Sequence, residues 1–267
     1  MLLYDQNTNY LNKEIIKRLP NWINTVGQYC LCLSNDIDSL MSCYYLTLHK
    51  KWDIKYFYSF YGLYKNQGIE VIPNTCIAVD ADLYSGKCFG NHLTNNINKD
   101  AININSLCNI GRHNYYNKFA GSTLITILSI LNVDINIFTE EQKEVILCID
   151  TMFKSYYFNK KQATYYIDTI LGYKELMDIL EKHDADYFYK IIDKYNLYAS
   201  INMVDGYLQT DIKLDELNKL FGFNLELPSK EFLLCKKFIK KTGVPVENNI
   251  FSLAWTYKNS AIYSVLS

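Results

Sequence analysis

The sequence lacks the features that identify several large classes of protein. Its eight cysteines include no CxxC pair, which argues against the common structural zinc sites. No apolar run reaches the ~20 residues that a membrane-spanning helix needs, so we do not expect a membrane protein. The formal net charge is only −1, so there is no global basic excess to hold long nucleic acid by its phosphates.

A secretory signal is also missing. The N-terminal stretch MLLYDQNTNY has no basic region followed by a long apolar region. Most of the cysteines lie within apolar runs, which is typical of buried, reduced thiols. We therefore expect a cytoplasmic protein. The 24 tyrosines are explained more simply by AT-rich codon usage than by a surface that stacks bases.

The chain does contain enough apolar material for a core. Hydrophobic residues make up 49% of its 267 residues and charged residues 21%, which is ordinary for a folded protein. Short apolar runs alternate with segments of helical spacing, and Pro20 interrupts the first of these at 12–25. The predicted strands are 28–34, 53–61 and 75–80, and the predicted helices are 38–50, 119–131, 141–158 and two or three more within 162–198. This alternation predicts an α/β fold, a parallel sheet with helices on both faces.

The pattern changes near residue 200. Residues 201–214 and 249–267 have the composition of strands, and residues 227–243 (LPSKEFLLCKKFIKKTG) are predicted to form a helix with Ser229 as its N-cap. We therefore expect two domains, an α/β domain over residues 1–198 and a small α+β C-terminal lobe over residues 199–267.

Carboxylates stand at the ends of two predicted strands. Asp36 and Asp38 follow the strand 28–34, and Asp80 ends the strand 75–80, with Asp82 two residues later. Ligands of open parallel sheets bind outside the carboxyl ends of the strands. Asp residues at the ends of strands often have only a structural role, because they cap helices or form turns. Two Asp-x-Asp units at two strand ends favour a site for Mg²⁺ or Mn²⁺, because a bound cation offsets the repulsion between gathered carboxylates.

Five motifs, taken in order, resemble those of the DHH phosphoesterase superfamily. They are LSNDIDSLMS, a strand leading to Asp-x-Asp; CIAVD, a strand ending in Asp; CFGNHLT, at the place of the Asp-His-His motif; AGSTLITIL, a small-residue helix; and LCIDTMF, an Asp-Thr on a helix. The resemblance covers roughly residues 28–160. It implies a metal site of Mn²⁺ or Mg²⁺ with the ligands Asp36, Asp38, Asp80, Asp150 and Asn91, and with His92 as the acid or phosphate contact.

The chain departs from the family pattern at several positions. Cys32 and Ser34 stand where the family has a metal-binding His, and Gly90 and Asn91 replace the Asp and the first His of the third motif. The C-terminal lobe also lacks the Gly-rich, His-containing segment with which nucleases of the family hold substrate. A single bound ion is therefore as compatible with the sequence as the two ions of the family.

The resemblance implies a metal-dependent phosphoesterase, a hydrolase that acts on a nucleotide or a short oligonucleotide. Arg112 and Lys118 precede the predicted helix 119–131 and are candidates for contacts with substrate phosphates.

Two alternatives remain open from the sequence. The first is a degenerate member that binds a nucleotide, a nucleic acid or a protein partner without hydrolysis, which the missing His residues favour. The second is a haloacid-dehalogenase-like phosphatase with Asp36 as nucleophile and Asp38 as acid/base, although Ser39 and Leu40 stand where that family has Gly-Thr.

Overall fold

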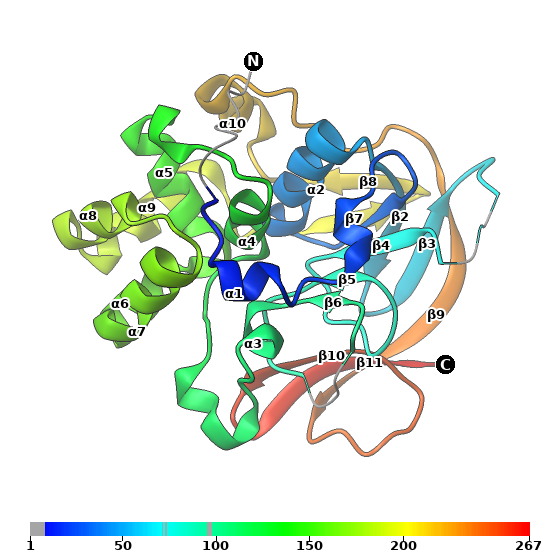
Figure 1. Cartoon of the computed structure of the whole chain (residues 1–267). Helices are drawn as coiled ribbons and strands as arrows, with labels where there is room; N and C mark the ends of the chain where they lie inside the picture. The colour runs from blue at the N-terminus through cyan, green and yellow to red at the C-terminus, as the bar shows by residue number, and fades with distance from the viewer. Residues whose placement is uncertain (1–8, 71, 73, 95–97) are drawn as a thin grey trace.

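The structure is a computed structural model that describes residues 9–70, 72, 74–94 and 98–267. The stretch used to predict the absence of a signal peptide lies mostly outside this range. The fold is mixed α/β, as predicted, and its main element is a nine-stranded mixed sheet (Figure 1). In spatial order its strands are β10 (Ile250–Tyr257), β11 (Ser260–Leu266), β9 (Phe232–Gly243), β3 (Gly62–Asn66), β2 (Asp53–Ser59), β1 (Cys30–Leu33), β4 (Cys76–Val79), β5 (Cys88–Phe89) and β6 (Ala101–Ile102).

Five neighbouring strands of this sheet are parallel. Strand β1 pairs in parallel with β2 on one side and with β4 on the other, and β4, β5 and β6 continue the parallel order. Strands β3, β9, β11 and β10 extend the sheet with antiparallel pairs. The predicted strands 28–34, 53–61 and 75–80 are thus confirmed as β1, β2 and β4, with ends shifted by a few residues.

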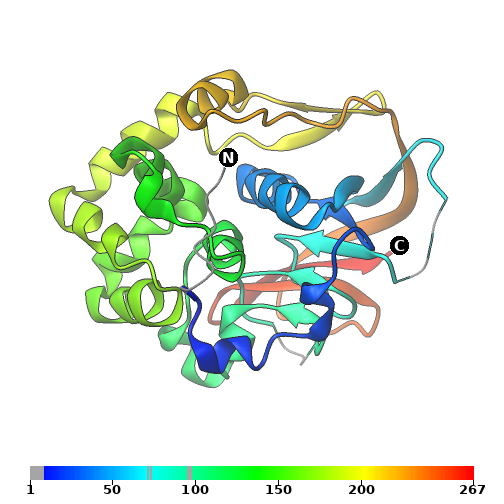
Figure 2. The same cartoon turned by 45° about the horizontal axis from the view of Figure 1, so that its top comes forward.

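The two faces of the parallel strands have different coverings. Leu31 and Leu33 belong to the largest apolar cluster, which includes the residues of the long helices. Cys30 and Cys32 belong to a second cluster whose described members come from strands and loops, among them Phe238 of β9. This follows from the alternation of side chains along a strand. The C-terminal strands β10 and β11, drawn in red, curl beneath the parallel strands of the sheet, as Figure 2 shows.

Helices form the other layer of the molecule. α2 and α4 pack against each other beside the sheet, and α5, α8 and α9 gather at the left of Figure 1. The helices are α1 (Lys13–Ile16), η1 (Asn21–Asn24), α2 (Ile37–Lys50), α3 (Ile104–Leu107), η2 (Arg112–Asn117), α4 (Thr123–Ile130), η3 (Ile135–Ile137), α5 (Glu140–Cys148), η4 (Ile149–Thr151), α6 (Phe153–Phe158), α7 (Lys160–Thr164), η5 (Tyr165–Ile170), α8 (Glu175–Lys182), α9 (Ala185–Tyr195) and α10 (Leu214–Phe221).

Two predicted helices differ in the structure. The predicted helix 141–158 is interrupted at Asp150, whose φ of 50° is left-handed, so that α5, η4 and α6 form three separate pieces.

The predicted break at Pro20 is confirmed, because α1 and η1 lie on either side of it.

The predicted helix 227–243 is wrong, because Phe232–Gly243 is strand β9. Phe232 and Phe238 are its buried apolar side chains, and an even spacing of six residues places both on one face of a strand. The strand lies between β3 and β11, which satisfy its backbone on both sides. This pairing with distant segments overrides the helical spacing of the local sequence.

The segment after residue 198 contributes to two sheets. Strands β7 (Ile201–Val204) and β8 (Tyr207–Thr210) form a two-stranded sheet, whereas β9, β10 and β11 belong to the nine-stranded sheet. The division into domains at 198/199 stays a prediction. Within the described ranges, no helix is both long and apolar enough to cross a membrane.

Candidate functional site

Ser39 forms hydrogen bonds to the ends of both strands that precede the aspartates, β1 and β4. Ser39 Oγ donates a hydrogen bond to Val79 O of β4 over 2.8 Å and accepts one from Ser34 N, at the end of β1, over 2.7 Å. Asp36 caps α2, since its Oδ1 accepts a hydrogen bond from Ser39 N. The helix therefore begins where β1 and β4 end, and Asp36 and Asp80 line the same small cavity.

Asp38 anchors a second helix in the site. Its side chain is buried, and its two oxygens accept hydrogen bonds from the backbone N–H groups of Thr123 (2.8 Å) and Leu124 (2.7 Å), in the first turn of α4. A carboxylate at a helix N-terminus is favourable because the free N–H groups and the helix dipole both attract negative charge. Asp38 thus has a structural role, and lone pairs for a cation remain on its oxygens.

Thr123 joins Asp38 to Asp80. Its backbone N–H binds Asp38 and its Oγ1 donates a hydrogen bond to Asp80 Oδ1 over 2.7 Å. Asp80 itself has a φ of 56°, a left-handed conformation that Asp and Asn adopt more readily than other non-glycine residues. The motifs predicted from separate parts of the sequence therefore meet at α4.

Asp150 completes a group of four carboxylates, Asp36, Asp38, Asp80 and Asp150, which we call the carboxylate cluster. Its backbone is also left-handed, and Asn91 Nδ2 donates a hydrogen bond to Asp150 Oδ2 over 2.7 Å and another to Gly121 O over 3.1 Å. Asn91 is buried, and its Oδ1 has no hydrogen-bond partner among the described residues. The buried Ser34 Oγ likewise lacks a partner there.

The carboxylates of the cluster raise one another's pKa. For Asp38 and Asp80, burial holds the pKa well above the usual value, and neighbouring carboxylates of the cluster raise it further. Burial also raises the pKa of Asp36, and the hydrogen bond that it accepts from Ser39 N partly offsets this. Burial and the charge of Asp36 raise the pKa of Asp150 to about 6, against the opposing effect of His92. Burial and mutual repulsion therefore both disfavour ionisation of the cluster, and a bound cation would offset this penalty.

His92 is held by a carboxylate that the sequence analysis did not select. Its Nδ1 lies 3.2 Å from Asp82 Oδ2, and its side chain is 35% exposed. Partial burial lowers the pKa of His92, but the hydrogen bond to Asp82 and the charges of Asp82 and Asp150 outweigh it and raise the pKa above the usual value. Asn103 Nδ2 fixes Asp82 by a hydrogen bond of 2.8 Å to its Oδ1.

The position of Asp82 also explains why residue 90, the first of the Gly-Asn-His sequence at 90–92, is a glycine. A Cβ atom at Gly90 would lie 2.1 Å from Asp82 Oδ1, so the Asp82 carboxylate occupies the space of a side chain at this position. Signals for these missed residues were present in the sequence, since Asp82 stands two residues after Asp80 and Asn103 N-caps a short helix.

Strand β10 forms one wall of the site. Leu253 N donates a hydrogen bond to Asp82 O over 2.8 Å, and Trp255 N donates one to Leu93 O over 2.9 Å. Three cavities surround the cluster. Cavity A (about 110 Å³) is lined by residues that include Ser34, Asp36, Asp80, Asp82, His92 and Ser252; cavity B (about 410 Å³) by Asn91, His92, Lys118, Asp150, Lys154 and Thr256 among others; and cavity C (about 310 Å³) by Asp36, Asp38, Asp150, Lys154 and Tyr198 among others.

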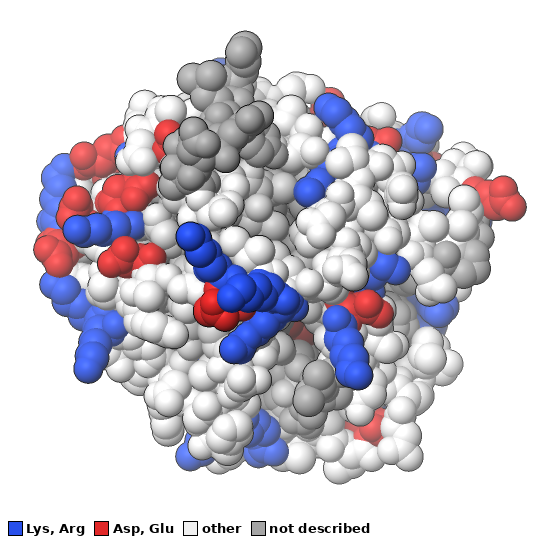
Figure 3. Space-filling model, in the orientation of Figure 1, with Lys and Arg blue, Asp and Glu red and all other residues white. Residues whose placement is uncertain are grey.

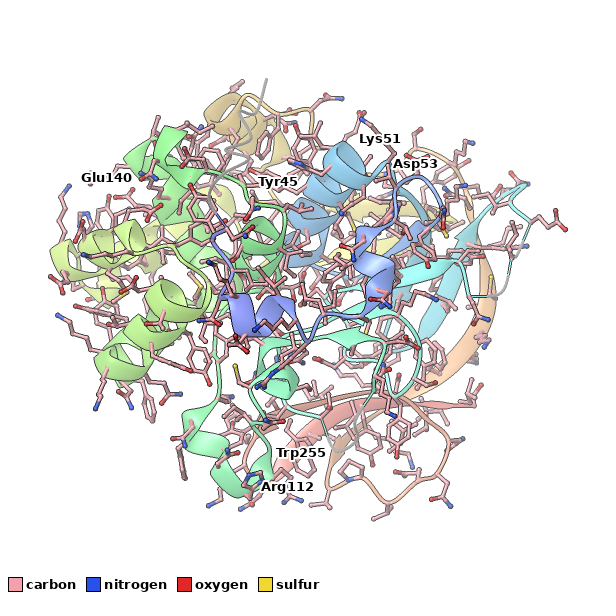
Figure 4. The ribbon with its side chains drawn as sticks, in the orientation of Figure 1. Tyr45, Lys51, Asp53, Arg112, Glu140 and Trp255 are labelled. Atoms are coloured by element: carbon pink, nitrogen blue, oxygen red, sulfur yellow. The ribbon has the colours of Figure 1, made fainter. Side chains whose placement is uncertain are left out.

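The two basic residues selected from the sequence lie in different places. Lys118 lines cavity B together with Asn91 and His92. The Arg112 guanidinium lies 4.0 Å from the ring centroid of Trp255, and its Nε donates a hydrogen bond to Lys258 O, as the lower part of Figure 4 shows for the Arg112 and Trp255 side chains. Arg112 is not among the residues lining cavities A, B and C. Lys154 lines cavities B and C and is a cation that sequence analysis missed.

A second group of potential metal ligands lies on other elements. Among the described residues, the one group of at least three His, Cys, Asp or Glu side chains whose ligand atoms all lie within 4.8 Å of one another is Glu140, Glu144 and His183. Glu140 forms an ion pair with Lys182, and Glu144 Oε1 accepts a hydrogen bond from Tyr187. Figure 4 shows Glu140 at the edge of the molecule. The spacing is compatible with one metal ion, but these existing partners account for the group.

The charges of the surface are mixed. On the face drawn in Figure 3, a small group of Lys and Arg side chains lies at the centre beside Asp or Glu, and the other charged side chains of both signs are scattered. Comparisons of the chain with models of protein families, with curated proteins and with solved structures find no match. The geometry of the carboxylate cluster and its three cavities is therefore the basis on which a function is proposed.

Proposed function

We propose that the protein is a metal-dependent phosphoesterase that hydrolyses a phosphoester or phosphodiester bond of a nucleotide or short oligonucleotide. The observation that carries the proposal is the carboxylate cluster, four aspartates from three segments gathered beside cavities large enough for a ligand. Burial with raised pKa values is destabilising for such a group, so its assembly needs a reason beyond folding.

The donors of the site suit Mn²⁺ or Mg²⁺. All are hard oxygen atoms, which both ions prefer, and the buried Asn91 Oδ1 and Ser34 Oγ are left without hydrogen-bond partners among the described residues. Asp36, Asp38, Asp80, Asp150 and Asn91 are the residues that would hold the ion. When bound, the ion would polarise the phosphate and lower the pKa of a coordinated water.

The side chains of cavity B supply the remaining chemistry. The raised pKa of His92 keeps its imidazole protonated at higher pH, so that its Nε2 can donate a proton to the leaving oxygen, while Asp82 orients the ring through Nδ1. Lys118 and Lys154 would neutralise charge on the substrate phosphate.

A nucleotide-binding protein without hydrolytic activity is the second candidate. Asn91 and Ser34 stand at the places of metal-binding His residues in the DHH family, and in the described chain no three carboxylates of the cluster bring their oxygens within 4.8 Å of one another. The haloacid-dehalogenase-like alternative is less favoured, because the oxygens of Asp38, its required acid/base, already accept two backbone hydrogen bonds.

Three further expectations belong to this proposal. They are a DHH-like α/β domain over residues 1–198, a C-terminal lobe over residues 199–267, and a cytoplasmic location.

The test is a calorimetric titration of Mn²⁺ and Mg²⁺ into wild type and Asp80→Asn. Asparagine tolerates the left-handed backbone at position 80, so the change removes the charge and retains the fold. Asp205→Asn is a matched control, because Asp205 is exposed and has a similar φ of 48°. We expect the wild type and Asp205→Asn to bind Mn²⁺ and Asp80→Asn to lose this binding.

A screen of nucleotides and short oligonucleotides for Mn²⁺-dependent hydrolysis completes the test. Hydrolysis by wild type and its loss in Asp80→Asn support the phosphoesterase. Metal or nucleotide binding without hydrolysis supports the second candidate. Absence of Mn²⁺ binding in the wild type would overturn the metal-dependent proposal.

A further inference from the structure

A fourth cavity lies next to cavity B and differs from it in character. This aromatic cavity has a volume of about 520 Å³, within the usual range for small-molecule sites, and its walls include Tyr115, Tyr116, Phe158, Tyr166 and Tyr257. It comes from segments far apart in the chain: η2, the α6–α7 region and the end of β10. Six of its sixteen lining residues are aromatic, whereas the lining of cavity B includes His92 and Asp150.

The two cavities are contiguous. Residues 118–120, Lys154, Ser155 and residues 256–257 line both of them. A ligand with one part in the aromatic cavity therefore has its other part beside His92 and Asp150. The ligand must combine a flat apolar group with an anionic group, because Lys118 and Lys154 stand on the shared wall.

The aromatic walls are unusually exposed. Phe158 is 75% exposed and Tyr257 72% exposed, although both are large apolar side chains. The deeper rings are fixed: Tyr115 OH donates a hydrogen bond to Thr256 O over 2.9 Å, and Tyr166 OH donates one to Asn117 O over 2.6 Å. A pocket with a rigid base and exposed rings at its mouth is a surface on which a planar ring can stack.

We propose that the aromatic cavity binds the base of a nucleotide whose phosphate lies in cavity B, on the shared wall with Lys118 and Lys154. This proposal rests on the proposed function and specifies how the substrate lies. A nucleotide combines a planar base with an anionic phosphate, and base–aromatic stacking accepts every base because each has a π-face.

The polar side chains of the cavity predict little discrimination between bases. Gln162 Nε2 donates a hydrogen bond to Lys118 O over 2.6 Å, and Gln162 Oε1 accepts one from Asn159 Nδ2 over 3.3 Å. Both side chains thus have partners within the protein and are not directed to the edge of a base. We expect adenosine and cytidine monophosphates to bind within about tenfold of each other, since stacking carries most of the recognition.

The experiment compares three probes by calorimetry in the presence of Mn²⁺: adenosine 5′-monophosphate, ribose 5-phosphate and adenosine. Phe158→Ala and Tyr257→Ala remove exposed rings of the cavity with little risk to the fold. Tyr207→Ala is the matched control, because Tyr207 is also exposed (47%) and lies on β8, outside all four cavities. We expect each cavity variant to bind the monophosphate about tenfold more weakly and Tyr207→Ala to bind it unchanged. Phe158 lines the aromatic cavity and not cavity B, so Phe158→Ala is expected to leave the affinity for ribose 5-phosphate unaffected.

The outcomes separate this inference from the proposed function. Equal affinity for the monophosphate and ribose 5-phosphate, or cavity variants that bind like the wild type, would overturn the base site while Mn²⁺ binding and hydrolysis still stand. Ring-dependent binding of the monophosphate without Mn²⁺ binding would support the base site and overturn the metal-dependent reaction. If no probe binds, the base site is overturned whatever the metal titration shows.

Discussion

The side-chain amide of Asn91 donates a hydrogen bond to Asp150 Oδ2 over 2.7 Å, across 59 residues of chain. The same nitrogen binds Gly121 O, so the amide connects the GNH loop, the start of α4 and η4. An asparagine therefore does what a histidine cannot do with a single ring N–H: it donates two hydrogen bonds and still leaves an oxygen available.

This relationship predicts the titration of Asp150. The hydrogen bond from Asn91 stabilises the ionised carboxylate and lowers its pKa, so Asn91→Ala is expected to raise the pKa of Asp150 above its value of about 6. Carbon-detected NMR titration of the metal-free protein measures it. Asn136→Ala, on the surface, serves as the control. An unchanged or lower pKa in Asn91→Ala would show that the hydrogen bond does not control the carboxylate.

Asp38 is expected to matter for stability as well as for the metal. Asp38→Ala leaves the N–H groups of Thr123 and Leu124 buried without acceptors, which costs about 1–3 kcal/mol of unfolding free energy. Urea denaturation measures the loss, and Asp211→Ala, at an exposed position, is expected to leave stability nearly unchanged. A fully stable Asp38→Ala protein would contradict the anchoring of α4.

The carboxylate cluster predicts an unusual dependence of stability on pH. Carboxyls of the unfolded chain lose their protons near pH 4, whereas Asp38, Asp80 and Asp150 keep theirs to higher pH in the folded state. Above about pH 4 the folded state thus binds more protons than the unfolded state, and the contribution of these groups to stability falls as pH rises. For Asp150 this fall is complete above about pH 6.

The measurement is the difference in unfolding free energy between wild type and Asp80→Asn at a series of pH values. Because the amide carries no charge, the unfolding free energy of metal-free Asp80→Asn is expected to increase relative to that of the wild type as pH rises from 4.5 to 8. Asp205→Asn is expected to follow the wild type, and Mn²⁺ is expected to raise the stability of the wild type most at high pH. A difference that shrinks with rising pH would contradict the raised pKa values.

Gly90 provides a test of the pairing between His92 and Asp82. In Gly90→Ala the new methyl group displaces the Asp82 carboxylate, so the pKa of His92 is expected to fall and the protein to lose about 1–3 kcal/mol of stability. Proton NMR titration of the histidines measures the pKa. Gly111→Ala is the matched control, because neither glycine has a positive φ and a Cβ at Gly111 meets only the His113 ring, at 3.2 Å or more. An unchanged His92 pKa in Gly90→Ala would show that Asp82 does not control this pKa.

Local sequence signals predicted part of this fold. A short apolar run before Asp36 gave β1 and the helical spacing after it gave α2, because these depend on nearby residues. The two-residue strands β5 and β6 have no such signal, and β9 is decided by its neighbours in the sheet rather than by its own spacing.

The site was predictable only to the extent that the aspartates follow strands. The sequence selected the four carboxylates, but Thr123 and Lys154 have roles that exist only once α4 and α6 lie beside the strand ends. Arg112 illustrates the reverse: its ring partner Trp255 is far away in the sequence, so its position over that ring could not be read from its own segment.

The pairing of β10 with residues near 83 and 93 has a consequence for the order of folding. Contacts over such long sequence separations form slowly, because a large loop must close first. During synthesis the aspartates leave the ribosome long before the strand that walls their cavities. The site can therefore be enclosed only after β10 has been synthesised and has paired with these residues.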